Sequence, residues 1–104
     1  MKTATKWDAS EYLETEEDMA AYLNAALEDG DTSVIAAALG DIARAKGMTQ
    51  LSKETGITRD GLYKALSPTG NPSFDTVQKV VRAFGLRLDV AAPHHTEKAA
   101  FSAS

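Results

Sequence analysis

The sequence predicts an all-α fold, a compact bundle of about five helices that contains a helix-turn-helix and can add a short C-terminal strand. Three observations support this. The 104 residues suit a single domain with one core, and no cysteine is present to supply disulfides or a thiolate metal site. Apolar residues recur at three- and four-residue steps, and glycines and capping residues separate these stretches. We expect an N-terminal extension over 1–14, the helix-turn-helix domain over 15–91 and a disordered tail over 92–104.

The first two helices are expected at about 16–28 and 32–46. Thr15 is a suitable N-cap because acidic residues follow it in the first turn, and Gly30 suits a C-cap. Asp31 or Thr32 should cap the second helix, which ends at Gly47. The apolar faces comprise Met19, Tyr22, Leu23, Ala26 and Leu27 in the first helix, and Ile35, Ala38, Leu39, Ile42 and Ala45 in the second.

Residues 49–67 predict two short helices that meet at a glycine. Thr49 is placed to cap the first helix, and Gly56 can adopt the left-handed conformation that ends it. Ile57 should fill the turn and Thr58 should cap the second helix. The apolar residues Leu51, Ile57, Leu62 and Leu66 then face the core. In a helix-turn-helix, the exposed face of the second helix enters the major groove of DNA.

Two residues fit this motif imperfectly. Ser52 occupies a position where helix-turn-helix motifs usually place alanine. Gly61 lies inside the proposed recognition helix, where glycine costs roughly 1 kcal/mol relative to alanine. It either permits a close approach to DNA or makes the helix less rigid. On spacing alone, a helix corner in any small α-helical protein explains residues 49–67 equally well.

The motif is followed by a turn, a helix and a strand-like segment. Residues 67–72 form a turn cluster, and Ser73 should cap a helix that ends at Ala83 or Phe84. Its apolar face comprises Phe74, Val77, Val80, Val81 and Phe84, and its exposed Lys79 and Arg82 are either phosphate contacts or solvated. Residues 86–90 alternate as a strand does, and a second copy of the chain could supply the partner, which favours a homodimer.

Charge is distributed unevenly along the chain. The net charge is −4, but residues 1–30 hold two lysines against eight acids, whereas 31–92 hold eight basic residues against six acids. The acidity is therefore N-terminal, and the remainder is compatible with binding phosphates. The longest apolar stretch, 34–39, is too short to span a membrane, and no signal peptide is evident, so we expect a cytoplasmic protein. The adjacent His94 and His95 do not have metal-ligand spacing.

Several motifs taken together resemble the probable addiction-module antidote family, HigA-like antitoxins with an Xre-type helix-turn-helix. The similarity runs from about Tyr12 to Val90 and is strongest over residues 41–49, 56–59, 62–67, 70–72 and 84–88. The resemblance implies a type II antitoxin that neutralises a RelE/ParE-superfamily (HigB-like) toxin and represses its own operon through sequence-specific DNA binding. A stand-alone phage-type Xre repressor without a toxin is the alternative.

The resemblance also implies roles for individual residues. It assigns Thr49 and Gln50 to phosphate and the groove-facing positions to Thr58, Arg59, Asp60, Tyr63 and Lys64. Arg59 is the foremost candidate, because arginine can make a bidentate contact with guanine worth roughly 1 to 3 kcal/mol of discrimination. Ser67, Thr69 and Asn71 follow the recognition helix and either hold phosphate or form a structural turn.

A basic toxin would find its complement in the acidic segment from Asp8 to Asp29. The candidate toxin-binding residues are Glu11, Glu14, Glu16, Glu17 and Asp18, although a solvated helix face explains them too. We expect the partners to be double-stranded operator DNA, the toxin and a second copy of the chain, with no membrane, small-molecule substrate, cofactor or metal. No nucleophile with a base, glycine-rich phosphate loop or ligand cluster indicates an enzyme.

Overall fold

The computed structural model describes residues 13–92, and all of its regular elements are helices. Their order is α2 (Glu16–Asp29), α3 (Thr32–Lys46), α4 (Met48–Thr55), α5 (Arg59–Ala65) and α6 (Phe74–Ala83). The predicted helical bundle is thereby confirmed. The bounds of α2, α3 and α6 lie within about a residue of those expected from caps and periodicity.

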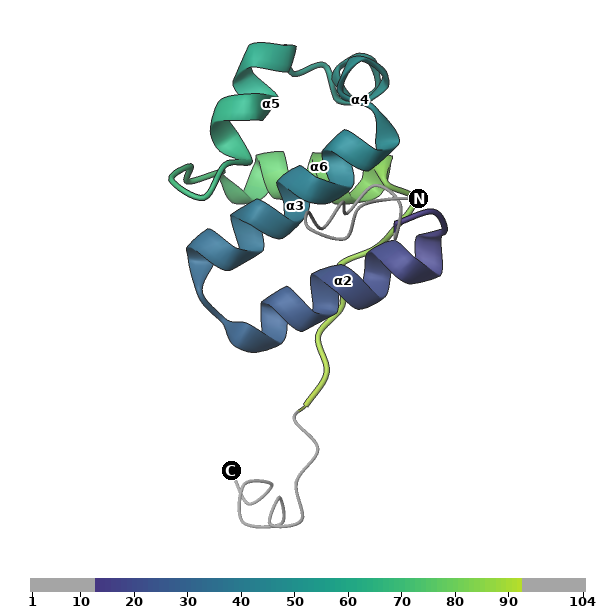
Figure 1. Ribbon diagram of the computed structural model, residues 1–104, viewed down its shortest axis with the longest axis vertical. Coiled ribbons are helices and arrows are strands. Elements are labelled where there is room, and N and C mark those ends of the chain that lie inside the picture. Colours follow the sequence, from purple (N-terminus) through teal and green to yellow (C-terminus); the bar gives the residue numbers. More distant parts are fainter. Residues whose placement is uncertain (1–12, 93–104) are drawn as a thin grey trace, which may run out of the picture.

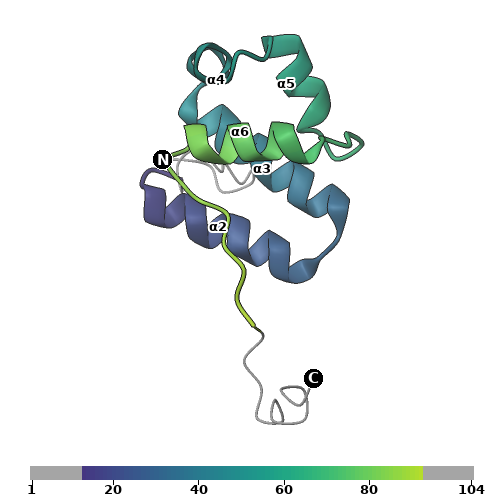
Figure 2. The same ribbon diagram turned by 180° about the vertical axis from the view of Figure 1, so that it is seen from behind.

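The five helices form a bundle with α3 and α6 in the middle. α2 packs along α3 on one side, and the α4–α5 corner lies on the other, with α4 contacting α3, α5 and α6 (Figure 1). The view from behind shows the same order (Figure 2). The helix corner and the N-terminal helix α2 are therefore at opposite ends of the bundle.

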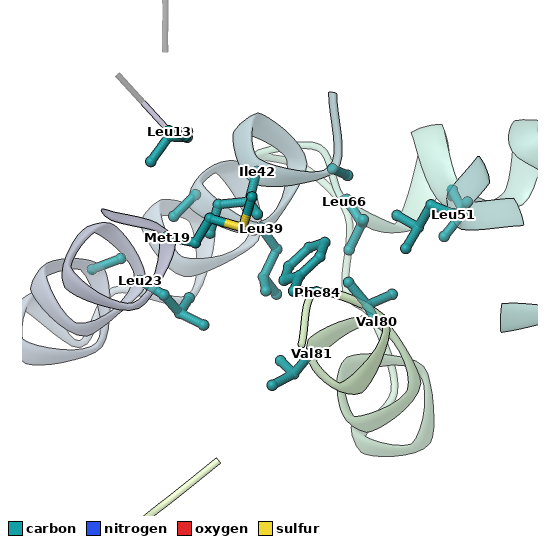
Figure 3. Packing of buried hydrophobic residues seen from close by; sticks show 14 of the residues in the cluster. Leu13, Met19, Leu23, Leu39, Ile42, Leu51, Leu66, Val80, Val81 and Phe84 are labelled. Carbon is teal, nitrogen blue, oxygen red and sulfur yellow. The ribbon is translucent and has the colours of Figure 1, made fainter. Parts of the chain in front are cut away.

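Phe84 is fully buried and lies at the centre of the core. Its ring extends from α6 toward Leu39 and Ile42 of α3, with Leu66 beside it (Figure 3). This single core joins all five helices. Its buried members are Leu13, Met19, Leu23, Ala26, Ala38, Leu39, Ile42, Ala43, Met48, Leu51, Leu62, Leu66, Val80, Val81 and Phe84.

Side chains cap α2, α3, α5 and α6 at their N-termini. The Thr15 hydroxyl accepts from the Asp18 amide at 3.0 Å, and the Asp18 carboxylate accepts in return from the Thr15 amide. Asp31 accepts from the Ser33 amide at 2.9 Å and thereby caps α3. These bonds satisfy amides that the first turn of a helix leaves unpaired, so the caps fix where each helix begins.

A polar contact joins α2 to α3. Tyr22 donates a hydrogen bond from its hydroxyl to the carboxylate of Asp41, which also pairs with Arg44. Burial, reinforced by the Asp41 carboxylate, raises the pKa of Tyr22 well above its usual value. Tyr22 thus packs its ring against the core, as its position in the apolar pattern predicts, while its hydroxyl fixes the two helices together.

Two expectations need correction, and a third is not tested by a single chain. Thr49 does not cap α4, because the helix already begins at Met48 after Gly47 and has no side-chain cap. Phe74 is 71% exposed rather than part of the core face, because α6 is buried through the residues of its C-terminal half. Residues 86–90 pair with no other strand within the described part of the single chain, and their expected pairing with a second copy stays a prediction.

Candidate nucleic-acid interface

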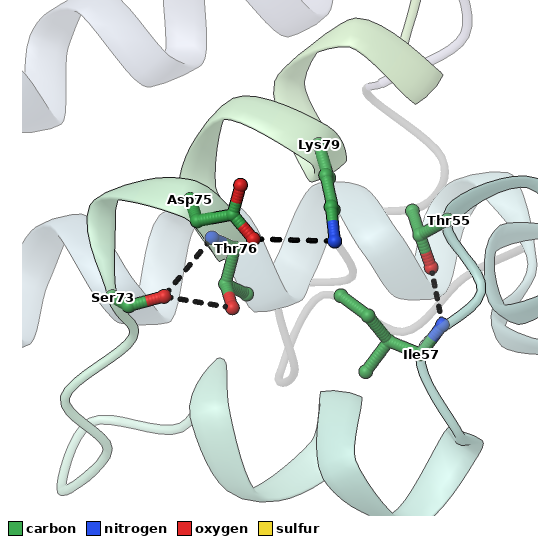
Figure 4. A network of polar contacts seen from close by, with 6 residues as sticks. All are labelled: Thr55, Ile57, Ser73, Asp75, Thr76 and Lys79. Carbon is green, nitrogen blue, oxygen red and sulfur yellow. Dashed lines mark hydrogen bonds and ion pairs between the residues drawn. The ribbon is translucent and has the colours of Figure 1, made fainter.

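Three hydrogen bonds stabilise the turn between α4 and α5. Gly56 adopts the left-handed conformation at φ 77°, and its amide donates to the Ser52 carbonyl at 2.9 Å. The Ser52 hydroxyl donates to the carbonyl of Ile57 at 2.6 Å. Thr55 bridges the same turn by accepting from the Ile57 amide at 3.1 Å (Figure 4). Serine in place of the usual alanine therefore adds a bond across the turn.

The first turn of α5 is built around Gly61. The Thr58 hydroxyl caps the helix by accepting from the Gly61 amide at 3.0 Å. A Cβ on Gly61 would lie 3.1 Å from that hydroxyl oxygen and 3.3 Å from a methyl group of Ile57. Glycine therefore lets the cap and the turn residue pack directly against the helix, which neither of the two sequence-based interpretations of Gly61 included.

Glycines also approach the C-terminal end of α5 from two sides. A Cβ on Gly40 of α3 would overlap the carbonyl oxygen of Leu66, and one on Gly70 would overlap the carbonyls of Lys64 and Ala65. Neither glycine was predicted from the sequence to be part of the site. Two sequence features could have indicated them, because Gly40 lies in the middle of a helical stretch and Gly70 lies inside a turn cluster.

The outward face of α5 carries four of the five predicted groove-facing side chains, and the fifth, Thr58, is the N-cap of the helix. Arg59, Asp60, Tyr63 and Lys64 are exposed, whereas Leu62 from the same helix is fully buried. Asp60 and Lys64 form an ion pair of 3.4 Å on the surface. The Arg59 guanidinium makes no ion pair or side-chain hydrogen bond within residues 13–92. It is thus the available cation at the start of the helix.

The predicted phosphate-binding residues lie on the elements that flank α5. Thr49 and Gln50 are exposed on α4, and the Gln50 amide donates to Glu54 at 2.8 Å. Ser67 donates to the Lys64 carbonyl at 3.1 Å and lies 3.3 Å from the Thr69 hydroxyl. The Ser67 hydroxyl therefore helps end the helix and fold the turn, in keeping with the structural interpretation, while Asn71 is exposed.

Two further cations differ in their availability. Lys53 of α4 is exposed and unpaired among the described residues, although it is not one of the residues predicted from the sequence. Lys79 of α6 pairs with Asp75 at 3.2 Å, beside the Thr55–Ile57 turn (Figure 4). From Met48 to Ala65 the charged residues are Lys53, Glu54, Arg59, Asp60 and Lys64, which gives the corner one net positive charge.

The acidic residues lie at the far end of the bundle. Glu14, Glu16 and Glu17 are exposed near the start of α2, and Asp18 is engaged in the capping box. Within its 14 residues α2 has five acids and no basic residue. Glu11, like the histidine pair at 94–95 and the rest of the tail from 93, lies outside the described residues.

Residues 13–92 contain no group of three or more His, Asp or Glu side chains placed to hold a metal ion. None of the five helices combines the length and the apolar composition that crossing a membrane would require.

Comparison with known proteins identifies the family. Residues 3–92 match the family model described as "Probable addiction module antidote protein". The chain is also 50% identical over 84 residues to an uncharacterized protein of Haemophilus influenzae, and the match covers 81% of this chain and 87% of that protein. No solved structure matches the chain. Because the family model spans most of the sequence, the chain belongs to the family of probable addiction module antidote proteins.

Proposed function

We propose that the chain is the antitoxin of a type II toxin-antitoxin module. It neutralises a RelE/ParE-superfamily, HigB-like toxin in the cytoplasm and represses its own operon by sequence-specific DNA binding. Family membership supports the antidote role. The DNA-binding role is carried by one observation, the exposed and unpaired Arg59 at the start of a helix whose two ends are held by close packing. Neither activity requires a catalytic group.

In this proposal α5 is the recognition helix and enters the major groove. Arg59 contacts guanine through two of its guanidinium N–H groups, and Lys64 reaches the same groove or its phosphates from the next turn. Tyr63 is 45% exposed, so its ring packs partly against the protein while its hydroxyl is free to reach the sugar-phosphate backbone of the DNA. Thr58 accepts from an amide within the cap, and its own O–H remains available to a phosphate oxygen.

The remaining proposed contacts frame the recognition helix. Thr49 and Gln50 at the start of α4, and Ser67 and Asn71 after α5, supply short polar groups to the phosphates on either side. Asp60 orients Lys64 through their ion pair and can accept from a cytosine amino group. Because phosphate contacts release counterions, operator binding should weaken steeply as the salt concentration rises.

The test for DNA binding compares Arg59→Ala with Arg59→Lys in mobility-shift titrations on the operator. Losing a bidentate guanine contact worth about 1 to 3 kcal/mol should lower specific affinity roughly 5- to 150-fold and relax preference at one base pair. Arg59→Lys keeps the charge but lacks the planar fork, so it should restore non-specific affinity without restoring that preference. Unchanged operator binding by Arg59→Ala would refute the assignment.

We propose that the toxin binds at the acidic end of the bundle. The supporting observation is that α2 has five acids and no basic residue and lies opposite the α4–α5 corner (Figure 1). Glu11, Glu14, Glu16 and Glu17 would meet basic groups of the toxin, while Asp18 remains in the cap of α2. With the surfaces at opposite ends, one copy can hold toxin and DNA together.

Charge substitution tests the toxin surface better than truncation. Deleting residues 1–29 would remove Leu13, Met19, Leu23 and Ala26 from the core and unfold the domain. The triple variant Glu14→Gln, Glu16→Gln, Glu17→Gln leaves the buried core unchanged but should bind the neighbouring gene product more weakly in a pull-down and rescue growth poorly. The matched control replaces Glu54, an acid of α4, with glutamine. Equal rescue by both variants would contradict the proposed surface.

The stand-alone repressor is the second candidate, because it would use the same α4–α5 corner. It differs in having no toxin, so a short reading frame for a basic protein beside the gene would favour the antitoxin. Co-expression of the two products followed by pull-down decides between them. In either case we propose a homodimer, because helix-turn-helix proteins generally bind two half-sites related by the symmetry of the dimer.

A further inference from the structure

The segment over 86–90 lies across α2 without a backbone partner. The Leu86 amide donates back to Val81 at the end of α6, and beyond it residues 87–92 make no backbone hydrogen bond within the described chain. Figure 2 shows the segment crossing the face of α2 before it leaves the bundle. An unpaired stretch of this kind offers a row of N–H and C=O groups to another strand.

Exposure from Leu86 to Asp89 follows the two-residue period of a strand. Leu86 and Leu88 are partly buried and pack against the core, whereas the Arg87 and Asp89 side chains are 84% and 77% exposed. Arg87 and Asp89 lie on one side, with a guanidinium nitrogen 3.5 Å from a carboxylate oxygen. The segment therefore already presents one apolar and one charged face, as half of a two-stranded ribbon would.

An apolar surface beside the segment is left uncovered. A hollow of about 370 Å³ is lined by Leu23, Leu27 and other residues of α2 and by residues 85–89 of the segment. Leu27 is 42% exposed and Val90 is 98% exposed, the highest value among the large apolar residues of the described chain. A strand laid beside 86–90 would bring apolar side chains to this surface.

The sequence of the segment is complementary to itself. Antiparallel pairing of two copies about Leu88 places Arg87 of one copy opposite Asp89 of the other, twice, and places Leu86 opposite Val90. Pairing about Arg87 or about Asp89 sets identical charges opposite each other. Pairing about a point between two residues sets apolar side chains opposite charged ones. One register alone therefore satisfies both the charges and the apolar face.

We infer that residues 86–90 form a two-stranded antiparallel ribbon with the same residues of a second copy, centred on Leu88. The inference specifies the surface of the proposed homodimer and rests on that part of the proposed function. The two-fold axis passes through Leu88, so each recognition helix is placed symmetrically about the ribbon. The toxin is the competing occupant of this edge, and the test below separates the two.

Charge reversal tests the register. Arg87→Asp and Asp89→Arg each set like charges opposite in a homodimer, whereas an equimolar mixture allows an all-acidic strand to face an all-basic one. Each single variant should dimerise on the order of tenfold or more weakly in sedimentation equilibrium. The mixture should recover the affinity, with the heterodimer above its statistical share in native mass spectrometry. The double variant, with both residues exchanged, should form a homodimer again.

Lys53→Asp is the matched control, because it makes the same charge change on α4 at an exposed site and should leave dimerisation unchanged. If the unmodified chain dimerises but neither single variant weakens it, the register is overturned and the proposed homodimer stands. A monomeric unmodified chain overturns both. If the segment pairs with the co-expressed toxin while the antitoxin stays monomeric, the inference is likewise overturned. Operator affinity of monomer and dimer is measured separately, so DNA binding is judged on its own result.

Discussion

Replacing Gly40 by alanine should displace the recognition helix from the bundle. Gly40 is buried on α3, and the carbonyl oxygen of Leu66 at the C-cap of α5 occupies the space that a Cβ would need. This neighbour is backbone rather than a flexible side chain, so the conflict can be relieved only by moving the end of α5. Leu66 is itself almost fully buried, and its displacement would disturb the core around Phe84.

The magnitude follows from two opposing effects. Forcing an additional methyl group into a packed interior typically costs about 1 to 3 kcal/mol. Alanine in place of glycine within a helix returns about 1 kcal/mol. We therefore expect a net loss of about 1 kcal/mol in the free energy of unfolding. For a domain of this size, that loss lowers Tm by roughly 4 to 8 °C.

Thermal unfolding followed by circular dichroism measures this loss, and titration of the operator reports the position of α5. Ala37→Gly is the control, because it makes the reverse exchange at a half-buried site of the same helix and isolates the helix-propensity effect. Gly40→Ala should lower both Tm and operator affinity, whereas Ala37→Gly should lower Tm alone. A Gly40→Ala protein as stable as the unmodified one, with the same operator affinity, would refute the reasoning.

Three further predictions concern the turn and the caps. Ser52→Ala removes the hydrogen bond to the Ile57 carbonyl and should lower the free energy of unfolding by about 0.5 to 1.5 kcal/mol in urea denaturation; an unchanged midpoint would show that the bond is not needed. Thr58→Ala should cost about 1 kcal/mol and speed hydrogen exchange of the Gly61 amide, whereas Thr58→Ser should preserve both. The hydrogen bonds that Asp31 accepts, first of all from the Ser33 amide, lower the pKa of its carboxyl below the usual value of 3.8. The charged Asp31 cap therefore stabilises the fold fully above pH 3.8, and this stabilisation is lost as the pH falls through the lower pKa of the folded state. Asp31→Asn keeps the cap without titrating, and its stability should vary less with pH in this acidic range; identical profiles would contradict the assignment.

Local sequence signals were sufficient for most of the helices. Thr15, Thr58 and Ser73 cap helices at the expected positions, because a capping side chain bonds to amides only two or three residues away. Gly56 ends α4 in the left-handed conformation for an equally local reason. The exposed face of α5 was likewise predictable, since Leu62 and Leu66 fix which side of a short helix is buried.

Contacts between distant parts of the chain were not predictable in the same way. Phe74 belongs to the apolar period of its helix, but its burial depends on how far the core extends along α6. Gly40 and Gly70 are recognisable as glycines, yet their function depends on carbonyl groups of α5 that only the folded chain brings near. The strand predicted over 86–90 depends on a partner that a single chain does not contain.

The recognition helix is fixed through its backbone, which leaves its side chains free. The Thr58 cap and Ile57 hold its first turn, and Gly40 and Gly70 hold its end by direct contact with carbonyl groups. With only seven residues, α5 would be unstable alone, since isolated helices need about 12 to 15 residues even when their composition is favourable. Because backbone contacts and two buried leucines supply the missing stability, Arg59 and its exposed neighbours are not required for folding. A change of operator preference can therefore arise by substitution on this face, whereas substitutions at the glycines should alter every operator alike.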